Sequence, residues 1–377
     1  MSKTLQDYAT LINDTIQSNE INHYITTDNM RQNLGGIDTL KNINIPQGKV
    51  RSFQKDDVLL SNIRLYFRKV YKAKQKGGCS SDILVFRAKH IDSATLFAIL
   101  SSQIFTDYAC LGSQGSKMPR GNKTHMMDFK IPTINFTIAK IFNSIQNKIE
   151  NNYKINELLH KILELLYEQY FVRFDFLDEN NKPYKTSGGK MKFSKELNRL
   201  IPSGWSVRFL NHKIVSTYQP KTISKTLLND SYSYSVYGGG GIIGRFTEYN
   251  YEQSEFIISC RGQCGISYLT LPKSWITGNA MVIRPTKSYT SKTYLYHTIK
   301  KYKLTNYITG SVQPQITRQN LSTMPILIPK RKTLNKWNNI SSLLWNLIHN
   351  NMQETQTLTV LRDFLLPLLL TQQVKPQ

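Results

Sequence analysis

The sequence predicts an α+β fold. Two α/β globular domains occur in tandem, each is followed by a long helix, and the two helices pair as an antiparallel coiled coil. Two observations support this prediction: a heptad pattern of apolar residues occurs twice in the same register, and strand-like segments ahead of each helix repeat at nearly the same offset. The chain has 377 residues, which is long enough for two domains with separate cores.

The two helical segments span residues 138–169 and 337–368. Apolar residues recur there at alternating steps of three and four, which is the a/d pattern of a coiled coil. A shift of 199 residues turns the first pattern into the second and places Asn152 and Asn351 at the same interior step. Because a buried Asn fixes register at a cost in stability, we expect antiparallel pairing with Asn152 near Glu354. The seam predicted for the first helix is Ile138, Ile141, Ile145, Lys148, Asn152, Ile155, Leu159, Ile162, Leu166 and Gln169.

The globular parts repeat more loosely. DVLLS at 57–61 matches EFIIS at 255–259, and DILVFR at 82–87 matches NAMVIR at 279–284. An Ile-Pro pair precedes each long helix, at 131–132 and 328–329, where proline suits a helix start. The predicted organisation is a first domain over 1–132, a helix over 133–174, a polar connector over 175–204, a second domain over 205–329 and a second helix over 330–377.

The charge balance indicates a polyanionic partner. The formal net charge is +24 and the isoelectric point is about 9.7. Lys and Arg placed near phosphates release counterions, which favours nucleic acid, although a basic surface without a partner is the alternative. The four cysteines form no CxxC pair and have no nearby His to complete a zinc site. With no signal pattern and no apolar run of membrane-spanning length, we expect a cytoplasmic protein.

Several segments, in this order and in duplicate, resemble the specificity (S, HsdS) subunit of Type I restriction–modification systems. IPSGWSVRFLNHKI (201–214) is similar to the opening of that family's target recognition domains. GSVQPQITRQNL (310–321) is similar to the family's Gly-Ser loop, and LRDFLLPLLL (361–370) to its terminal helix. The first copy departs from the pattern because it lacks the Gly-Trp opening, so its first strand is expected to be shorter or arranged differently.

The resemblance implies a non-catalytic subunit that reads a bipartite double-stranded DNA target, one half per recognition domain. It also implies two methyltransferase (M) subunits on the helices and motor-nuclease (R) subunits for cleavage. S-adenosylmethionine, ATP and magnesium are then expected in those partners and not in this chain. A stand-alone DNA-binding regulator or decoy is the alternative. Docking of M subunits requires apolar residues off the seam, and the candidates are Tyr153, Leu158, Leu163, Leu165, Tyr167, Leu343 and Ile348.

The candidate DNA contacts are basic and amide side chains in a basic–aromatic segment over 64–76, in the glycine-rich segments of the second copy and in the two Gly-Ser loops. Arg suits guanine, and Asn or Gln suits adenine, although Arg and Lys also contact phosphates. The alternative for residues 64–76 is a solvated strand or loop face, and the alternative for the Gly-Ser loops is a structural turn that leads into the helix. For Arg120 and Arg318, phosphate contact is favoured over base readout. The residues predicted to contact DNA are Arg64, Arg68, Lys69, Lys117, Arg120, Asn122, Lys123, Arg245, Arg261, Gln313, Gln315 and Arg318.

Motifs for catalysis or cofactor binding are missing from the sequence. It contains no NPP[FYW], no E-x-K tripeptide, no GxxxxGK[ST] and no HxxxH or HEXXH spacing. A GxGxxG match at Gly239, Gly241 and Gly244 is followed by turn-like and strand-like sequence, where a dinucleotide site needs a helix. We therefore predict flexible backbone near DNA or a tight β-turn there, and no catalytic, cofactor-binding or metal-binding residues in this chain.

Overall fold

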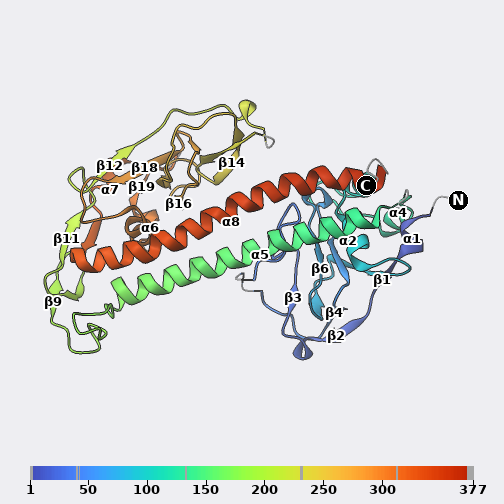
Figure 1. The fold of residues 1–377 in the computed structure, drawn as a ribbon, viewed down its shortest axis with the longest axis horizontal. Coiled ribbons are helices and arrows are strands. Elements are labelled where there is room, and N and C mark those ends of the chain that lie inside the picture. Colours follow the sequence, from blue (N-terminus) through green and yellow to red (C-terminus); the bar gives the residue numbers. More distant parts are fainter. Residues whose placement is uncertain are drawn as a thin grey trace. The chain divides into compact units, whose positions relative to one another are not determined.

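The computed structural model describes residues 3–39, 41, 43–131, 134–229, 232–310 and 313–371. The chain divides into two compact units, the first made of Met1–Leu158 with Asn350–Gln377 and the second of Leu159–His349. Each unit combines antiparallel strand pairs with a segment of each long helix (Figure 1). The predicted α+β class is therefore confirmed.

The first unit is built on two four-stranded sheets, with the strand orders β1-β8-β5-β6 and β2-β4-β7-β3. Neighbouring strands are antiparallel except β3 and β7. The strands are β1 (Ala9–Ile12), β2 (Thr15–Gln17), β3 (Tyr24–Ile25), β4 (Lys49–Phe53), β5 (Val58–Ser61), β6 (Val70–Lys72), β7 (Gly77–Cys79) and β8 (Ile83–Ala88). The helices are α1 (Leu5–Tyr8), α2 (Ser93–Ser101), α3 (Gln103–Leu111) and α4 (Lys123–Met127), with 3-10 turns η1 (Ser18–Glu20) and η2 (Leu65–Phe67).

Strands β5 and β8 are buried on both faces because successive side chains point to opposite sides of a strand. Leu60 and Phe86 pack into the core that contains α2 and the long helices. Leu59 and Val85 pack on the other side, against residues of the second sheet. This two-sided burial explains why both strands read as continuous apolar runs and do not alternate.

The second unit has a four-stranded sheet of order β12-β18-β15-β16 and a three-stranded sheet of order β14-β13-β17. Two-stranded pairs join β11 with β21, β9 with β10 and β19 with β20. The strands are β9 (Met191–Ser194), β10 (Arg199–Pro202), β11 (Ser206–Phe209), β12 (Val215–Tyr218), β13 (Tyr234–Gly238), β14 (Gly241–Phe246), β15 (Phe256–Ser259), β16 (Ser267–Leu269), β17 (Trp275–Ile276), β18 (Ala280–Pro285), β19 (Ile308–Thr309), β20 (Gln315–Ile316) and β21 (Pro325–Ile328). The helices are α6 (Lys292–Lys300) and α7 (Arg318–Leu321), with 3-10 turns η4 (Lys225–Leu227) and η5 (Leu304–Tyr307).

The predicted repeat is visible in the strand topology. The order β1-β8-β5-β6 in the first unit corresponds to β12-β18-β15-β16 in the second, and β18 leads to α6 as β8 leads to α2. Parallel pairing also recurs, as β3 with β7 and as β13 with β17. The GxGxxG match lies in the β13–β14 hairpin, which agrees with the predicted β-turn.

The first copy begins differently from the second, as its missing Gly-Trp opening predicted. In the second unit, β11 and β21 form a four-residue antiparallel ladder from Ser206–Ile328 to Phe209–Pro325. In the first unit the corresponding pairing is one isolated bridge between Thr4 and Lys130. The start of the first domain is therefore attached by fewer backbone hydrogen bonds than the start of the second.

The long helices are α5 (Phe136–Tyr167), which continues into a π-helical turn over Glu168–Val172, and α8 (Arg331–Thr371). Within the first unit they run antiparallel, because the hydrogen-bonded partners rise in number on α8 as they fall on α5. Asn351 donates a hydrogen bond to Asn156, Asn152 donates one to Glu354, and Arg362 donates one to Gln146. Within the second unit the ring centroids of His160 and Trp345 are 5.1 Å apart, and those of Tyr167 and Trp337 are 5.8 Å apart. The predicted pairing and its central polar step are confirmed (Figure 1).

The predicted seam is only partly correct. Ile138, Ile145 and Asn152 are buried, but Ile141, Ile155 and Ile162 on the same helix are each 44% exposed. On α8, predicted seam residues Ile340, Leu347 and Leu361 are also exposed. The heptad pattern assumed that the other helix is the main partner. Each helix also packs on the globular domains, and this rotates its buried stripe away from the predicted seam.

The actual buried stripe repeats at the same offset of 199 residues. In the first unit, the N-terminal part of α5 packs on the globular domain together with the C-terminal part of α8; in the second unit, the two helices exchange these roles. The buried equivalent pairs are Ile138 and Trp337, Phe142 and Ser341, Gln146 and Trp345, Ile149 and Ile348, Glu150 and His349, Leu163 and Arg362, and Tyr167 and Leu366.

The predicted connector over 175–204 contains the β9–β10 hairpin. Pro329 follows β21 and precedes α8 by one residue, as expected for a helix start, whereas Pro132 lies outside the described residues. The predicted domain boundaries remain a prediction, because the division into compact units separates the two parts of each long helix. Among the described residues, no single helix is long and apolar enough to cross a membrane; α2 and α3 meet that test only together, across a 62° bend.

Buried histidines in the second unit predict a loss of stability in mild acid. Burial lowers the pKa of His297 to about 3 and that of His349 to about 4, and neither Nε2 atom has a hydrogen-bond partner among the described residues. The unfolded chain binds protons near pH 6.5 that the folded chain does not. Stability should therefore fall from about pH 6.5 to pH 4, by up to about 1.4 kcal/mol per pH unit for each histidine.

Urea unfolding across this pH range, followed by tryptophan fluorescence, measures the effect, because Trp337 and Trp345 lie against His297. His349→Phe should flatten the pH dependence. An equal slope in the variant and the wild type would show that His349 does not contribute.

Asn152 should specify the pairing of the helices at a cost in stability. Its Nδ2 donates to Glu354 Oε2 at 2.8 Å and Thr355 Oγ1 at 3.2 Å, while its buried Oδ1 has no partner among the described residues. We expect Asn152→Leu to raise stability by about 1–3 kcal/mol and to permit self-association through slipped helices. Thermal unfolding and light scattering test this, with exposed Asn151→Leu as the matched control. A less stable, monomeric Asn152→Leu protein would contradict it.

Candidate nucleic-acid interface

The same loop pairing occurs in both units and brings predicted site residues together. After β5, Ile63 forms an antiparallel bridge with Arg120, and Arg64 N donates to Pro119 O at 2.9 Å. After β15, Arg261 bridges Gln315, and Ile316 N donates to Cys260 O at 3.1 Å. The Gly-Ser loops, far from these strands in sequence, are therefore fixed beside the residues that leave the central strands.

Among the candidate DNA contacts of the first unit, the exposed ones lie in the Gly-Ser loop. Lys117 and Lys123 are exposed. Arg120 is also exposed, and its guanidinium forms a 2.8 Å ion pair with Asp82. Asn122 accepts a hydrogen bond from His125 N and caps α4, which supports a structural role for its carbonyl oxygen. This loop can present cations to a phosphate backbone, while Asn122 has part of its hydrogen-bonding capacity occupied.

The basic residues around η2 are turned toward the protein. Arg68 donates to Ser101 O at 2.8 Å, and Lys69 Nζ donates to Thr27 O. Burial lowers the pKa of both Arg68 and Lys69. Arg64 donates to Lys117 O at 3.3 Å and is half-buried. Their contact with DNA remains a prediction, and in this conformation Arg68 and Lys69 hold the loop to its own domain.

In the second unit, Arg261, Gln313, Gln315 and Arg318 are all exposed. Arg261 and Gln315 are paired through their backbones, and Arg318 begins α7 a few residues further along the loop. The loop is also fixed by Cys264, whose Sγ donates to Pro314 O at 3.0 Å. These side chains form a group with both amide and guanidinium donors, which suits contacts to base edges and phosphates.

The glycine-rich turn between β13 and β14 lies against this group. A Cβ at Gly239 would be 2.8 Å from Arg261 O, so only glycine permits the close approach. A Cβ at Gly240 would be 3.9 Å from Gln263 Oε1, which places the exposed Gln263 at the same loop. Sequence reasoning missed Gln263, although it follows Arg261 by two residues. Arg245 is separate: its guanidinium donates to Tyr232 O and Ser233 O, several residues along β14 from the turn.

A carboxylate–arginine pair occupies equivalent positions in both units. Asp57 accepts two hydrogen bonds from Arg87, both at 2.8 Å, and Glu255 accepts two from Arg284, at 3.1 and 2.7 Å. In each case the acid raises the pKa of the arginine. The pairs join the central strands β5 with β8 and β15 with β18. They were missed because the acid and the arginine are far apart in the sequence.

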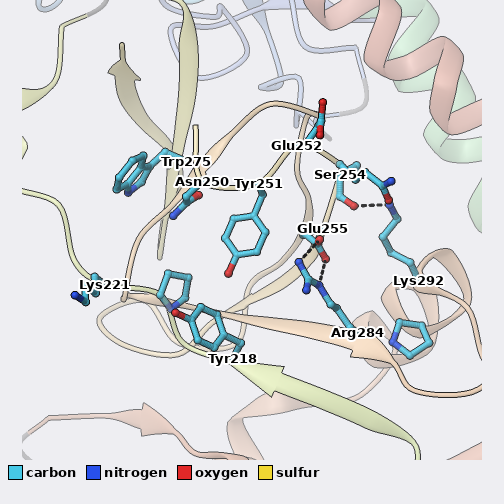
Figure 2. Close-up of a pocket in the computed structure, with 13 residues that line it drawn as sticks. Tyr218, Lys221, Asn250, Tyr251, Glu252, Ser254, Glu255, Trp275, Arg284 and Lys292 are labelled. Atoms are coloured by element: carbon cyan, nitrogen blue, oxygen red, sulfur yellow. Dashed lines mark hydrogen bonds and ion pairs between the residues drawn. The ribbon is translucent and has the colours of Figure 1, made fainter. Parts of the chain in front are cut away.

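Figure 2 shows the second pair within an open cleft of about 970 Å³, lined by Tyr218, Tyr251, Trp275 and Lys292. The Arg284 guanidinium lies 5.3 Å from the Tyr251 ring centre. In the β15–β18 ladder, Ser259 pairs with Ala280, whereas Glu255 and Arg284 lie beyond the opposite end. The cleft is therefore at the other end of the sheet from Arg261. Among the described residues, no group of three or more His, Cys, Asp and Glu could hold a metal ion.

The Gly-Ser loop of the first unit should provide sequence-independent affinity for duplex DNA. Lys117→Ala with Lys123→Ala should weaken binding to all duplexes and reduce the slope of log affinity against log salt by up to about 2, since about one counterion is released per phosphate contact. Fluorescence anisotropy over a salt series measures both effects. The matched control is Lys185→Ala with Lys192→Ala, which removes two exposed lysines from the connector. Equal losses in both double variants would mean that only net charge matters.

Comparisons with known proteins show what the chain is similar to in sequence and in fold. Residues 202–359 match the family model described as the Type I restriction modification DNA specificity domain. The Type I restriction enzyme MjaIX specificity subunit of Methanocaldococcus jannaschii is 21% identical over 313 residues, which cover 73% of this chain and 67% of the relative. The crystal structure of a Type I restriction–modification system S subunit from M. genitalium covers 98% of this chain and 96% of its own, with a TM-score of 0.62 and 16% identity. Residues 202–359 thus carry the DNA specificity domain of Type I restriction–modification systems, and the chain as a whole is similar in sequence to one Type I specificity subunit and shares the fold of another.

Proposed function

We propose that this chain is the non-catalytic DNA-recognition subunit of a Type I restriction–modification complex and that each globular domain reads one half of a bipartite target. The observation that carries the proposal is the repeated loop pairing, Ile63 with Arg120 and Arg261 with Gln315. Two equivalent sites with exposed cationic and amide side chains suit two half-sites on one duplex. A single domain would contact only one of them.

Apolar side chains on the long helices support the docking of partner proteins. Of the off-seam candidates, Leu158, Leu165 and Leu343 are 58%, 56% and 67% exposed. Leu163, Tyr167 and Ile348 are instead buried against the globular domains, so their prediction as exposed docking residues was wrong. Tyr153 is half-buried, with the Arg31 guanidinium 5.0 Å from its ring centre.

Further exposed apolar residues lie on the same helices, among them Phe136, Val360 and Phe364. Rows of exposed apolar side chains on a helix are costly in water and typical of an interface. We infer that two methyltransferase subunits cover these helices and that motor-nuclease subunits join them for cleavage. This favours a subunit of a complex over the alternative of a stand-alone regulator or decoy.

The chemistry then belongs to the partners. In this proposal the methyltransferase subunits bind S-adenosylmethionine and methylate adenine, while the motor-nuclease subunits bind ATP and magnesium. This chain determines the DNA sequence at which the complex binds. The complex works in the cytoplasm, where the genomic DNA of a prokaryotic host is found.

The test is adenine methylation mapped across the genome of a host that expresses the chain with its methyltransferase subunits. We expect one bipartite motif that disappears when the gene for this chain is removed. Exchange of residues 1–130 for those of a relative should change one half of the motif and leave the other intact. A swap that altered both halves would show that the domains read DNA as one joint surface. DNA binding without any methylation would favour the regulator.

A further inference from the structure

One fully buried cation lies in the first unit, away from the loops that carry the exposed cations. Arg362 of α8 is only 1% exposed. Its Nη1 donates to Asn33 O and to Gln146 Oε1, both at 3.2 Å, and its Nε donates to Asp363 Oδ1 at 3.0 Å. A buried guanidinium is costly unless its donors are paired, so these contacts determine where the end of α8 can pack.

The backbone that Arg362 holds is a strained turn. Asn33 and Leu34 have φ values of +52° and +60°, which non-glycine residues adopt at a cost, and Leu34 is completely buried. Gln146 of α5 donates to Leu34 O. Both long helices therefore donate to carbonyls of the same two-residue turn, and these hydrogen bonds help to hold the strained conformation.

The other side of the turn holds the η2 loop. Asn33 N donates to Phe67 O at 2.9 Å, and Leu34 N donates to Arg68 O at 3.1 Å. Arg64, at the start of this loop, donates its backbone N–H to Pro119 O, next to Arg120 of the Gly-Ser loop. Hydrogen bonds thus connect α8, the 33–34 turn, the η2 loop and the candidate interface, all within the first unit.

The second unit shows that packing a helix pair on a globular domain does not require these polar groups. The positions equivalent to Arg362, Gln146 and Glu150 are Leu163, Trp345 and His349, each buried in the second unit. Replacement of a buried charge by an apolar residue is often neutral or stabilising. Stability alone therefore does not explain a buried arginine in the first unit.

We propose that Arg362 is a positioning residue: through Asn33 and Leu34 it sets the position of the η2 and Gly-Ser loops, and hence the readout of the first half-site. The inference rests on the proposed function for its DNA readout, but not for its effect on loop position. The first domain has a specific need for such a support, because its opening strand is reduced to the single Thr4–Lys130 bridge. The second domain has the four-residue β11–β21 ladder instead.

The decisive variant is Gln146→Leu combined with Arg362→Met. It places apolar side chains at both positions, as Leu163 and Trp345 do in the second unit, and it avoids leaving the Gln146 amide buried without its Arg362 partner. The matched control is Arg331→Met, at an exposed position of the same helix. Arg362→Lys retains the charge but loses the forked donors, so it should give an intermediate result. Thermal unfolding of the full chain should show that the double variant still unfolds cooperatively, at a somewhat lower temperature than the wild type, because the carbonyls of Asn33 and Leu34 lose their side-chain donors.

Hydrogen exchange on the full chain without DNA is the first measurement. In the double variant, amides of residues 33–34 and 64–69 should exchange at least about tenfold faster, because loss of a charge-assisted hydrogen bond is worth about that factor. Amides of β15 and β18 should be unchanged, as should all amides in the control. Unchanged exchange at 33–34 and 64–69 would overturn the proposal.

The second measurement is selection of duplexes from a random library by the chain in complex with its methyltransferase subunits. The double variant should lose about tenfold in discrimination at one half-site and retain the other, and Arg331→Met should select as the wild type does. Full discrimination at both half-sites would mean that Arg362 only stabilises the fold, and equal loss at both would mean that it acts on the whole chain. If the wild type selects no sequence, the proposed function fails, and hydrogen exchange alone decides whether Arg362 positions the loops.

Discussion

The structure depends on the burial of one stripe of each long helix against two different globular domains. The N-terminal part of α5 and the C-terminal part of α8 bury their stripes in the first unit, and the other parts of the same helices bury theirs in the second. Neither unit is complete without a segment of both helices. The repeat is therefore a requirement of packing: each helix must present a suitable stripe twice, and positions 199 residues apart are buried in equivalent places, one in each unit.

We call the place where the two long helices pack on a globular domain a joint. The joints of the two units bury equivalent helix positions but use different side-chain chemistry. In the second unit, Trp337, Trp345 and His297 form an aromatic cluster that needs no charge. In the first unit, Gln146 and Arg362 bond the backbone of a left-handed turn. An aromatic joint gains stability from buried area, whereas a polar joint accepts only the geometry that satisfies its donors. We therefore expect the first joint to constrain position more tightly than the second.

The candidate interface follows from the strand order. The central strands of each unit are buried on both faces and tied by a carboxylate–arginine pair, so their ends are rigid points from which loops can project. In each unit the Gly-Ser loop attaches by an equivalent backbone bridge beyond the C-terminal end of the central strand, at the end opposite the carboxylate–arginine pair. What differs between the two sites is the side chains, and two copies of one framework can thereby present different donors to DNA.

The sequence alone was sufficient for the fold class, the tandem repeat, the antiparallel helices and their central polar step, because these follow from periodicity and from the repeated order of segments. It was also sufficient to place the Gly-Ser loops among the candidate contacts. Only the tertiary structure decided which helix faces are buried, because a heptad pattern does not reveal that Ile141 and Ile155 lie outside the cores while Leu163 and Ile348 lie within them. It also decided that Arg68 and Lys69 bond their own domain and that Arg362 reaches Asn33. Such contacts join residues far apart in the chain, and their geometry depends on how whole elements pack, which local pattern does not encode.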